Sequence, residues 1–173
     1  MIVVVMGVCG CGKTTVGRAL ANQLGWPFFD ADDFHPQANI AKMAKGVALT
    51  DEDREPWLDR LAAEVREVDR KRQHAVLACS ALKESYRQRI ARGRENPEAE
   101  GEGGSAVRIV YLKGDAKTIE PRLALRSGHY MPPSLLASQF AALEEPGDAM
   151  VIDIRQTIEA QAAQIAAALR STV

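Results

Sequence analysis

The stretch from Gly7 to Thr14 has the residue types and the spacing of a phosphate-binding loop. It reads Gly-Val-Cys-Gly-Cys-Gly-Lys-Thr and matches the pattern G-x-x-x-x-G-K-[ST] throughout. Glycines allow several backbone N–H groups to point at one anion, and the start of a helix adds partial positive charge. We expect Lys13 to contact the β- and γ-phosphates of a nucleotide and Thr14 to be a ligand of Mg²⁺. The sequence therefore predicts a site for a nucleoside triphosphate.

The segments on either side of this loop support that interpretation. An apolar run at residues 2–6 predicts a buried strand before it, and residues 14–24 predict a helix after it. This setting disfavours the alternative, a glycine-rich turn with an accidental lysine. The predicted nucleotide-binding residues of the loop are Gly7, Val8, Cys9, Gly10, Cys11, Gly12, Lys13, Thr14 and Thr15.

Three aspartates, Asp30, Asp32 and Asp33, follow a second short apolar stretch at residues 28–29. The carboxyl ends of parallel strands form the ligand-binding edge of a sheet, so we expect these carboxylates beside the phosphates. A kinase needs an anion there to orient an acceptor hydroxyl and to accept its proton. We expect Asp32 in this role, with Asp30 as the second choice. The alternative is a solvated turn that caps a helix.

The class of phosphate-loop protein is narrowed by two features that the chain lacks. The predicted strand at residues 75–79 ends without an acidic residue, where a Walker B carboxylate would stand. The chain also has no N-K-x-D motif, which argues against a GTPase. Together with the aspartates described above, this pattern favours a kinase that acts on a small molecule.

Predicted strands alternate with predicted helices along the chain. The strands are expected at residues 2–6, 28–29, 75–79, 107–112 and 149–152. This alternation predicts one α/β domain over residues 1–173, with a five-stranded parallel sheet flanked by helices. Residues 33–72 contain no predicted strand, and we expect them to form a helical insert that binds the acceptor. Residues 126–134 are expected to form a short lid that excludes water.

The composition suits a globular domain and gives no sign of a polymeric or membrane partner. The chain has 173 residues, of which 46% are hydrophobic and 26% charged, and its net charge is −1. Such a balance carries no electrostatic footprint for nucleic acid, and the apolar runs are too short to span a bilayer. The first apolar run lacks the basic flank of a signal peptide, so we expect a cytoplasmic protein.

Three cysteines, Cys9, Cys11 and Cys79, are too few to suggest a disulfide framework. Cys9 and Cys11 would make half of a soft-metal site. No further cysteine or histidine is close in sequence, so we interpret the two as small side chains that fill the loop. Because thiols at a helix N-terminus tend to have a lowered pKa, we also expect oxidation to inhibit the protein.

Several further segments carry ordered motifs. Asp30–Pro36 with Asn39–Met43 reads D-x-D-x-x-H-P…N-x-x-K-M, Leu49–Leu58 reads L-x-D-x-D-R-x-P-W-L, and Cys79–Arg87 reads C-S-A-L-K-x-x-Y-R. Tyr111–Asp115, Arg122–Leu123, Gly128–His129 and Gln139–Glu144 continue the series. In these segments and in the phosphate loop, the chain resembles the small P-loop gluconokinases. The resemblance extends over nearly the whole length of the chain.

This resemblance implies a reaction and a fold. The reaction is the ATP-dependent phosphorylation of D-gluconate at its 6-hydroxyl, which gives 6-phosphogluconate and ADP. The fold is that of a nucleoside-monophosphate kinase, with strand order 2-3-1-4-5, and the family is often homodimeric, so we expect a homodimer.

The expected acceptor, gluconate, is a small polyol with a carboxylate, and it needs a cation at one end and hydrogen bonds along its length. Arg54 offers a bidentate pair for the carboxylate. The other expected acceptor-binding residues are Asp30, Asp32, His35, Lys83, Arg87 and His129.

Two arginines and a glutamine complete the expected site. Arg122 and Arg126 lie four residues apart on one predicted helix, a spacing that fits a nucleotide clamp and equally fits a pair of surface arginines. As a clamp, Arg126 would reach the transferred phosphoryl group and Arg122 the nucleotide. Gln156, after the last predicted strand, is expected to border the adenine.

Two alternatives remain. One is a kinase of another small molecule on the same fold, such as shikimate or a nucleoside monophosphate. Shikimate kinases carry a glycine triplet after the third strand in sequence, whereas this chain has Cys79–Lys83 there, which weighs against that acceptor. The other is a regulator that binds ATP without transferring phosphate.

Overall fold

The computed structural model describes residues 1–93, 107–125 and 135–171. Its strands are β1 (Ile2–Met6), β2 (Phe28–Asp30), β3 (Ala75–Ala78), β4 (Val107–Lys113) and β5 (Met150–Asp153). Its α-helices are α1 (Lys13–Leu24), α2 (Gln37–Ala44), α3 (Asp51–Arg70), α4 (Glu84–Ala91), α5 (Ala116–Ala124), α6 (Leu136–Ala142) and α7 (Ile158–Arg170), and a 3-10 turn, η1 (Ala31–Phe34), follows β2.

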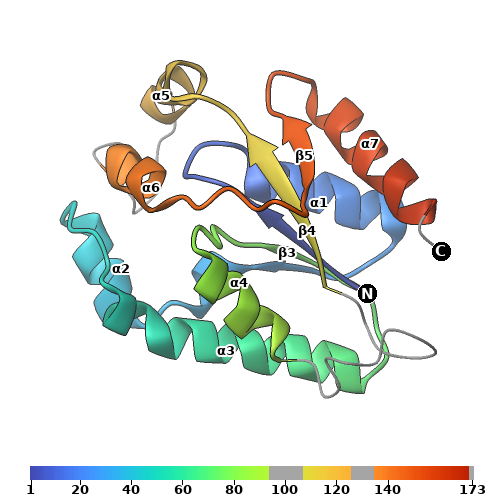
Figure 1. The fold of residues 1–173 in the computed structure, drawn as a ribbon, viewed down its shortest axis with the longest axis horizontal. Helices are drawn as coiled ribbons and strands as arrows, with labels where there is room; N and C mark the ends of the chain where they lie inside the picture. Colours follow the sequence, from blue (N-terminus) through green and yellow to red (C-terminus); the bar gives the residue numbers. More distant parts are fainter. Residues whose placement is uncertain (94–106, 126–134, 172–173) are drawn as a thin grey trace.

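The five strands form one parallel sheet in the order β2-β3-β1-β4-β5. This order confirms the expected fold. The central strand β1 pairs with both β3 and β4, and Val5 lies opposite Ala78 on one side and Val110 on the other. The carboxyl ends of β1, β2 and β3 therefore meet at one edge, where α2, α5 and α6 gather far from the two termini (Figure 1).

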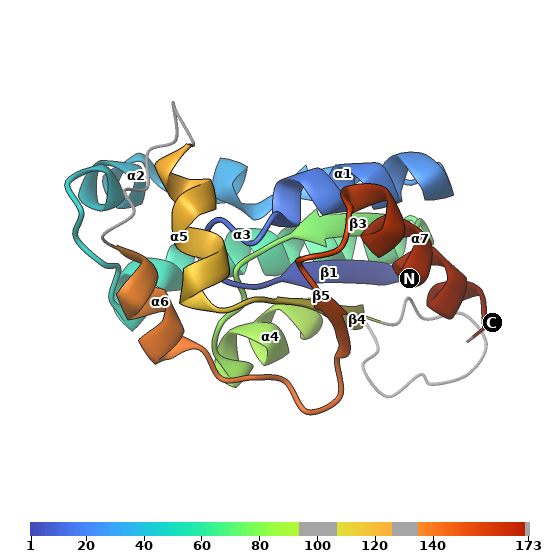
Figure 2. The same ribbon diagram turned by 90° about the horizontal axis from the view of Figure 1, so that it is seen from above.

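Helices cover both faces of the sheet because β1 is apolar on both of its sides. Val3 and Val5 belong to one core, which α1 and α7 cover, whereas Ile2, Val4 and Met6 belong to a second core under α3 and α4. Figure 2 shows α1 and α7 together on one side of the sheet and α4 on the other. All five side chains of β1 are buried, as the continuous apolar run of a central parallel strand requires.

Residues 33–72, all of them described, contain α2 and α3 and no strand. A capping box starts α3, because the Thr50 hydroxyl accepts from the Asp53 N–H and the Asp53 carboxylate accepts from the Thr50 N–H. The buried face of α3 includes Trp57, Leu61 and Val65 and packs on the sheet. The predicted lid at residues 126–134 lies outside the described part of the chain. Within the described residues, no helix has the length and apolarity needed to cross a membrane.

Candidate active site

The phosphate loop joins the end of β1 to the start of α1 through three glycines with positive φ. The φ values are 144° at Gly7, 82° at Gly10 and 103° at Gly12, in a region that L-residues rarely adopt. Space is restricted as well, since a Cβ atom on Gly10 would lie 2.7 Å from a side-chain carbon of Leu123 in α5. The positive φ accounts for the glycines that the motif specifies, Gly7 and Gly12, and at Gly10, which the motif leaves open, the packing of Leu123 also leaves no room for a larger residue.

The two polar side chains that end the loop are already oriented by hydrogen bonds. Lys13 donates from Nζ to the Val8 carbonyl oxygen at 2.9 Å, which folds its ammonium group back over the loop. Thr14 donates from Oγ1 to Oδ2 of Asp30 at 2.8 Å. The second contact joins the start of α1 to the end of β2, so a hydroxyl and a carboxylate oxygen stand side by side next to the loop.

The aspartates after β2 divide into two groups. Asp30 caps the turn η1 by accepting the Asp32 N–H at 3.1 Å, and its other oxygen accepts from Thr14. Asp30 and Asp32 both line the cavity beside the phosphate loop, whereas Asp33 is exposed and lies outside that lining. The structure therefore brings two of the three expected carboxylates to the site.

A single cavity of about 240 Å³ connects the phosphate loop with the helical insert. Its lining contains these expected site residues: Cys9, Gly10, Gly12, Lys13, Thr14, Thr15, Asp30, Asp32, His35, Arg54 and Arg122. Gly7, Val8 and Cys11 are buried in the loop and are not part of the lining. Residues from the phosphate loop, from the insert and from α5 thus converge on one space.

His35 and Trp57 form a stacked pair in the wall of this cavity on the side of the helical insert. Their rings lie 4.5 Å apart with 9° between their planes. Trp57 donates from Nε1 to the Ala31 carbonyl oxygen at 2.7 Å, which ties α3 to the turn that carries Asp32. Burial lowers the pKa of His35 to about 4, with Asp32 opposing the shift and Arg54 adding to it, so the ring is neutral at neutral pH. Among the described residues, Nδ1 of His35 is buried without a hydrogen-bond partner.

Arg54 places a positive charge on the same side of the cavity. Its Nη1 donates to the carbonyl oxygens of Leu49 and Thr50 at 2.6 and 3.1 Å, which anchors the guanidinium at the start of α3. Its ion pair with Asp51 is long, at 3.9 Å. An anchored guanidinium whose carboxylate partner within the described residues is this distant is suited to an anionic group of a ligand.

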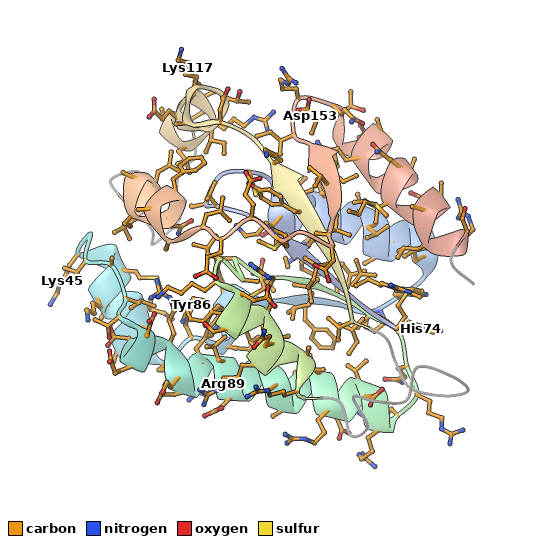
Figure 3. All side chains as sticks on the ribbon, in the orientation of Figure 1. Lys45, His74, Tyr86, Arg89, Lys117 and Asp153 are labelled. Atoms are coloured by element: carbon orange, nitrogen blue, oxygen red, sulfur yellow. The ribbon has the colours of Figure 1, made fainter. Side chains whose placement is uncertain are left out.

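Two expected acceptor-binding residues, Lys83 and Arg87, lie outside this lining. Lys83 donates to both oxygens of Asp51 at 2.9 and 2.8 Å, and Tyr86, labelled in Figure 3, also donates to Asp51. Arg87 is 6% exposed, and its guanidinium is occupied by Glu84 and by two backbone carbonyl oxygens. In this conformation both cations hold α4 in place and are not presented to the cavity.

The expected nucleotide contacts beyond the loop are divided between two places. Arg122 lines the cavity and donates from Nη2 to the Ile154 carbonyl oxygen at 2.8 Å, which joins α5 to the end of β5. Gln156 lies instead in a neighbouring hollow between β5 and α5. Arg126 and His129 lie outside the described residues.

The cysteines of the loop contradict the expectation of reactive thiols. Cys9 and Cys11 are 6% and 1% exposed. Burial raises the pKa of the Cys11 thiol, and the charge of Lys13 only partly opposes this. Burial also raises the pKa of Cys79 to about 12. The prediction of a lowered pKa is therefore wrong for Cys11, because desolvation outweighs the nearby positive charge.

Sequence reasoning missed several residues of the cavity. They are Met43, Ala48, Leu49, Trp57, Ser80, Leu82, Leu135, Ser138 and Gln139. Gln139 is the most informative, since its Oε1 accepts the Cys9 N–H of the phosphate loop at 2.6 Å. Its only signal in the sequence is its place in the motif Gln139–Glu144, which carries no indication of what the side chain contacts.

Comparisons with known proteins place this chain in a family. A family model described as shikimate kinase matches residues 9–166. A protein called probable gluconokinase from Mus musculus is 47% identical over 152 residues, which cover 84% of this chain and 83% of that protein. The thermoresistant gluconokinase of Escherichia coli is 41% identical over 162 residues, with 91% and 87% of the two chains covered.

A solved structure agrees with these relatives. The crystal structure of a sugar kinase from Janibacter sp., without ligand, superposes with a TM-score of 0.85 at 41% identity and covers 98% of this chain and 94% of its own. Likeness of this length and degree is enough to assign the family of the chain. The chain belongs to the broad family that the shikimate kinase model describes and, within it, to the gluconokinases.

Proposed function

We propose that this protein transfers the γ-phosphoryl group of ATP to the 6-hydroxyl of D-gluconate, giving 6-phosphogluconate and ADP. The observation that carries the proposal is the shared cavity of about 240 Å³. Its lining includes residues of the phosphate loop together with Asp32, His35 and Arg54. Donor and acceptor groups of a phosphoryl transfer need this proximity, because the reaction depends on positioning and on charge stabilisation.

The donor half of the site would bind the triphosphate through backbone N–H groups and Lys13. The helix α1 begins at Lys13, so its positive end adds to the same region. The hydroxyl of Thr14 and the carboxylate of Asp30, 2.8 Å apart, are oxygen donors of the kind that Mg²⁺ prefers, and they would hold it with the phosphates and water. When bound, this ion would supply positive charge at the β- and γ-phosphates.

Asp32 is our choice for the residue that orients the 6-hydroxyl and accepts its proton. Asp30 already accepts from Thr14 and from the Asp32 backbone, which favours a role at the donor side. Asp32 lies two residues further on, on the wall shared with His35. As the 6-hydroxyl oxygen attacks the γ-phosphorus and ADP leaves, the hydroxyl proton would pass to the Asp32 carboxylate. Loss of this proton makes the oxygen a stronger nucleophile.

The acceptor half would recognise the rest of the polyol acid. Arg54 would pair with the carboxylate of gluconate, and the neutral ring of His35 would donate to or accept from a hydroxyl. The stacked rings of His35 and Trp57 form one wall of the cavity, where they would exclude water. Exclusion of water protects the γ-phosphate from hydrolysis while the acceptor is bound.

One assay tests this function against its alternatives. ADP release is measured with D-gluconate, shikimate and the nucleoside monophosphates as acceptors, and the phosphorylated product is examined by ³¹P NMR. We expect turnover with gluconate, and a ³¹P signal split into a triplet by the two protons of C6. Faster turnover with shikimate or with a nucleoside monophosphate would show that this molecule, and not gluconate, is the acceptor. Nucleotide binding without turnover on any of them would identify a regulator.

A further inference from the structure

Gln139 makes a contact with the phosphate loop that spans most of the sequence. It lies on α6, and its Oε1 accepts the backbone N–H of Cys9 at 2.6 Å across 130 residues. A backbone N–H is only a donor, so the amide oxygen of Gln139, and not its NH₂ group, must face it. Cys9 is 6% exposed, and a buried N–H without an acceptor would be costly.

The N–H of Cys9 belongs to the same peptide group as the carbonyl of Val8. That carbonyl accepts from Lys13 Nζ at 2.9 Å and from the Cys11 N–H at 3.3 Å. One peptide plane is therefore held at both ends, by the Gln139 amide on its N–H side and by the Lys13 ammonium on its C=O side. Hydrogen bonds in such a chain polarise one another, so the bond at Cys9 strengthens the carbonyl as an acceptor.

The neighbouring part of the loop leaves this peptide little room to turn. A Cβ atom on Gly10 would meet Leu123 at 2.7 Å and Ile119 at 3.0 Å, so α5 packs directly against the loop on that side. Gln139 holds the loop from α6. Cys9, Lys13 and Gln139 all line the cavity, which places this chain of hydrogen bonds beside the phosphates of the proposed nucleotide.

We propose that Gln139 is a positioning residue that acts through the Val8–Cys9 peptide to hold the Lys13 ammonium where it meets the β- and γ-phosphates. The inference deepens the proposed function in that it assumes a nucleotide at this loop, but it does not depend on which acceptor is phosphorylated. It also assigns a role to the motif Gln139–Glu144. At the other end of that motif, Glu144 accepts the Glu84 N–H at 2.6 Å, so the segment links the phosphate loop to the start of α4.

The test compares the affinity for ADP with that for AMP in Gln139→Met, which keeps the length of the side chain and removes the acceptor oxygen. ADP carries a β-phosphate for Lys13 and AMP does not. We expect roughly 5- to 10-fold weaker ADP binding by calorimetry, AMP binding unchanged, and kcat lower by a similar factor. Gln139→Asn, one methylene shorter, is expected to behave in the same way if the methionine variant folds poorly.

Ala141→Met is the matched control, because it places the same side chain on an exposed position of α6. It is expected to leave the affinities for both nucleotides and kcat unchanged. A lower melting temperature of Gln139→Met with the ratio of ADP to AMP affinity unchanged would overturn the proposal and leave Gln139 a purely structural role. Because these affinities are measured without an acceptor, failure of wild-type turnover on gluconate would count against the proposed function and not against this inference.

Discussion

The two halves of the cavity are built by different means. On the donor side, eight consecutive residues, Gly7–Thr14, form the loop, and its shape comes from backbone angles and a helix start. On the acceptor side, single side chains from η1 and α3 and from the segments beside them converge, with Asp32, His35 and Arg54 as its polar members. In the proposed reaction, phosphate, which is common to many ligands, would be bound by backbone N–H groups, whereas the specific acceptor would be bound by side chains.

This difference predicts which substitutions should impair the donor half and which the acceptor half. Backbone N–H groups survive substitution of side chains, so the donor half is broken mainly by loss of Lys13 or of a glycine. In the acceptor half each side chain has its own task, so substitutions should separate acceptor binding from nucleotide binding. The following predictions test that separation.

The largest effect is expected at the donor half, in Lys13→Ala. Loss of the ammonium that we propose to contact the β- and γ-phosphates should lower kcat by about 10³-fold or more. The fold should persist, because Lys13 contributes one hydrogen bond, to the Val8 carbonyl oxygen, that the structure describes. Steady-state ADP release and circular dichroism check both points. The control is Lys117→Ala on α5, whose side chain points outward (Figure 3). Activity retained in Lys13→Ala would contradict the proposed donor site.

At the junction of the two halves, Asp32→Asn should lower kcat by on the order of 10²- to 10⁴-fold, because the amide cannot accept the proton of the hydroxyl. Binding of ATP should change little, since Asp30 and Thr14 keep their contact. Single-turnover kinetics separate chemistry from product release. A near-normal kcat in Asp32→Asn would show that Asp32 is not the base and that Asp30 or water accepts the proton.

Within the acceptor half, Arg54→Ala should raise the KM for gluconate by about 10- to 100-fold. This factor corresponds to the binding free energy of a charge-assisted bidentate contact. The KM for ATP should stay within about twofold. Arg54→Lys retains the charge without the planar fork and should fall between wild type and alanine. An equal rise in the KM for gluconate and the KM for ATP would show that Arg54 does not bind the acceptor specifically.

The smallest effect concerns stability and pH at His35. Its pKa is lowered to about 4 in the folded protein, whereas an unfolded histidine titrates near 6.5. Between these values the unfolded chain binds a proton at His35 that the folded chain does not bind. The contribution of His35 to the free energy of unfolding should therefore fall as the pH drops from about 6.5 to 4 and stay constant above about pH 6.5. The loss should reach about 1–2 kcal/mol at pH 4.5, a value reduced for the partial exposure of the ring.

Urea unfolding of wild type and His35→Gln at several pH values measures this contribution. The difference between the two proteins should slope only below about pH 6.5, because other groups, including His74, cancel in the comparison. A difference independent of pH would show that His35 is not held neutral by burial.

Much of the fold was open to prediction from sequence, because the apolar runs and their helical neighbours carry the period of a parallel α/β sheet. The strand order came with the family motifs, and the structure has the same order. The phosphate loop could be predicted in full, since its function depends on consecutive residues and on local backbone angles. The placement of Asp30 and Asp32 beside the loop followed from the rule that strand ends share one edge.

The tertiary structure alone decided which side chains reach the cavity. Lys83 and Arg87 carry the right charge within the segment Cys79–Arg87, yet Asp51 and Glu84 pair with them in the fold, because a buried or partly buried cation needs a partner. Cys11 stands beside Lys13 in sequence, but desolvation raises its pKa, and desolvation is a property of the packed molecule. Gln139 reaches Cys9 across 130 residues, a contact that no local pattern encodes. The sequence by itself therefore determined the chemistry of the donor, which is written in one short segment. Only the folded chain determined the acceptor wall and its positioning contacts, because these depend on distances between residues that are remote in sequence.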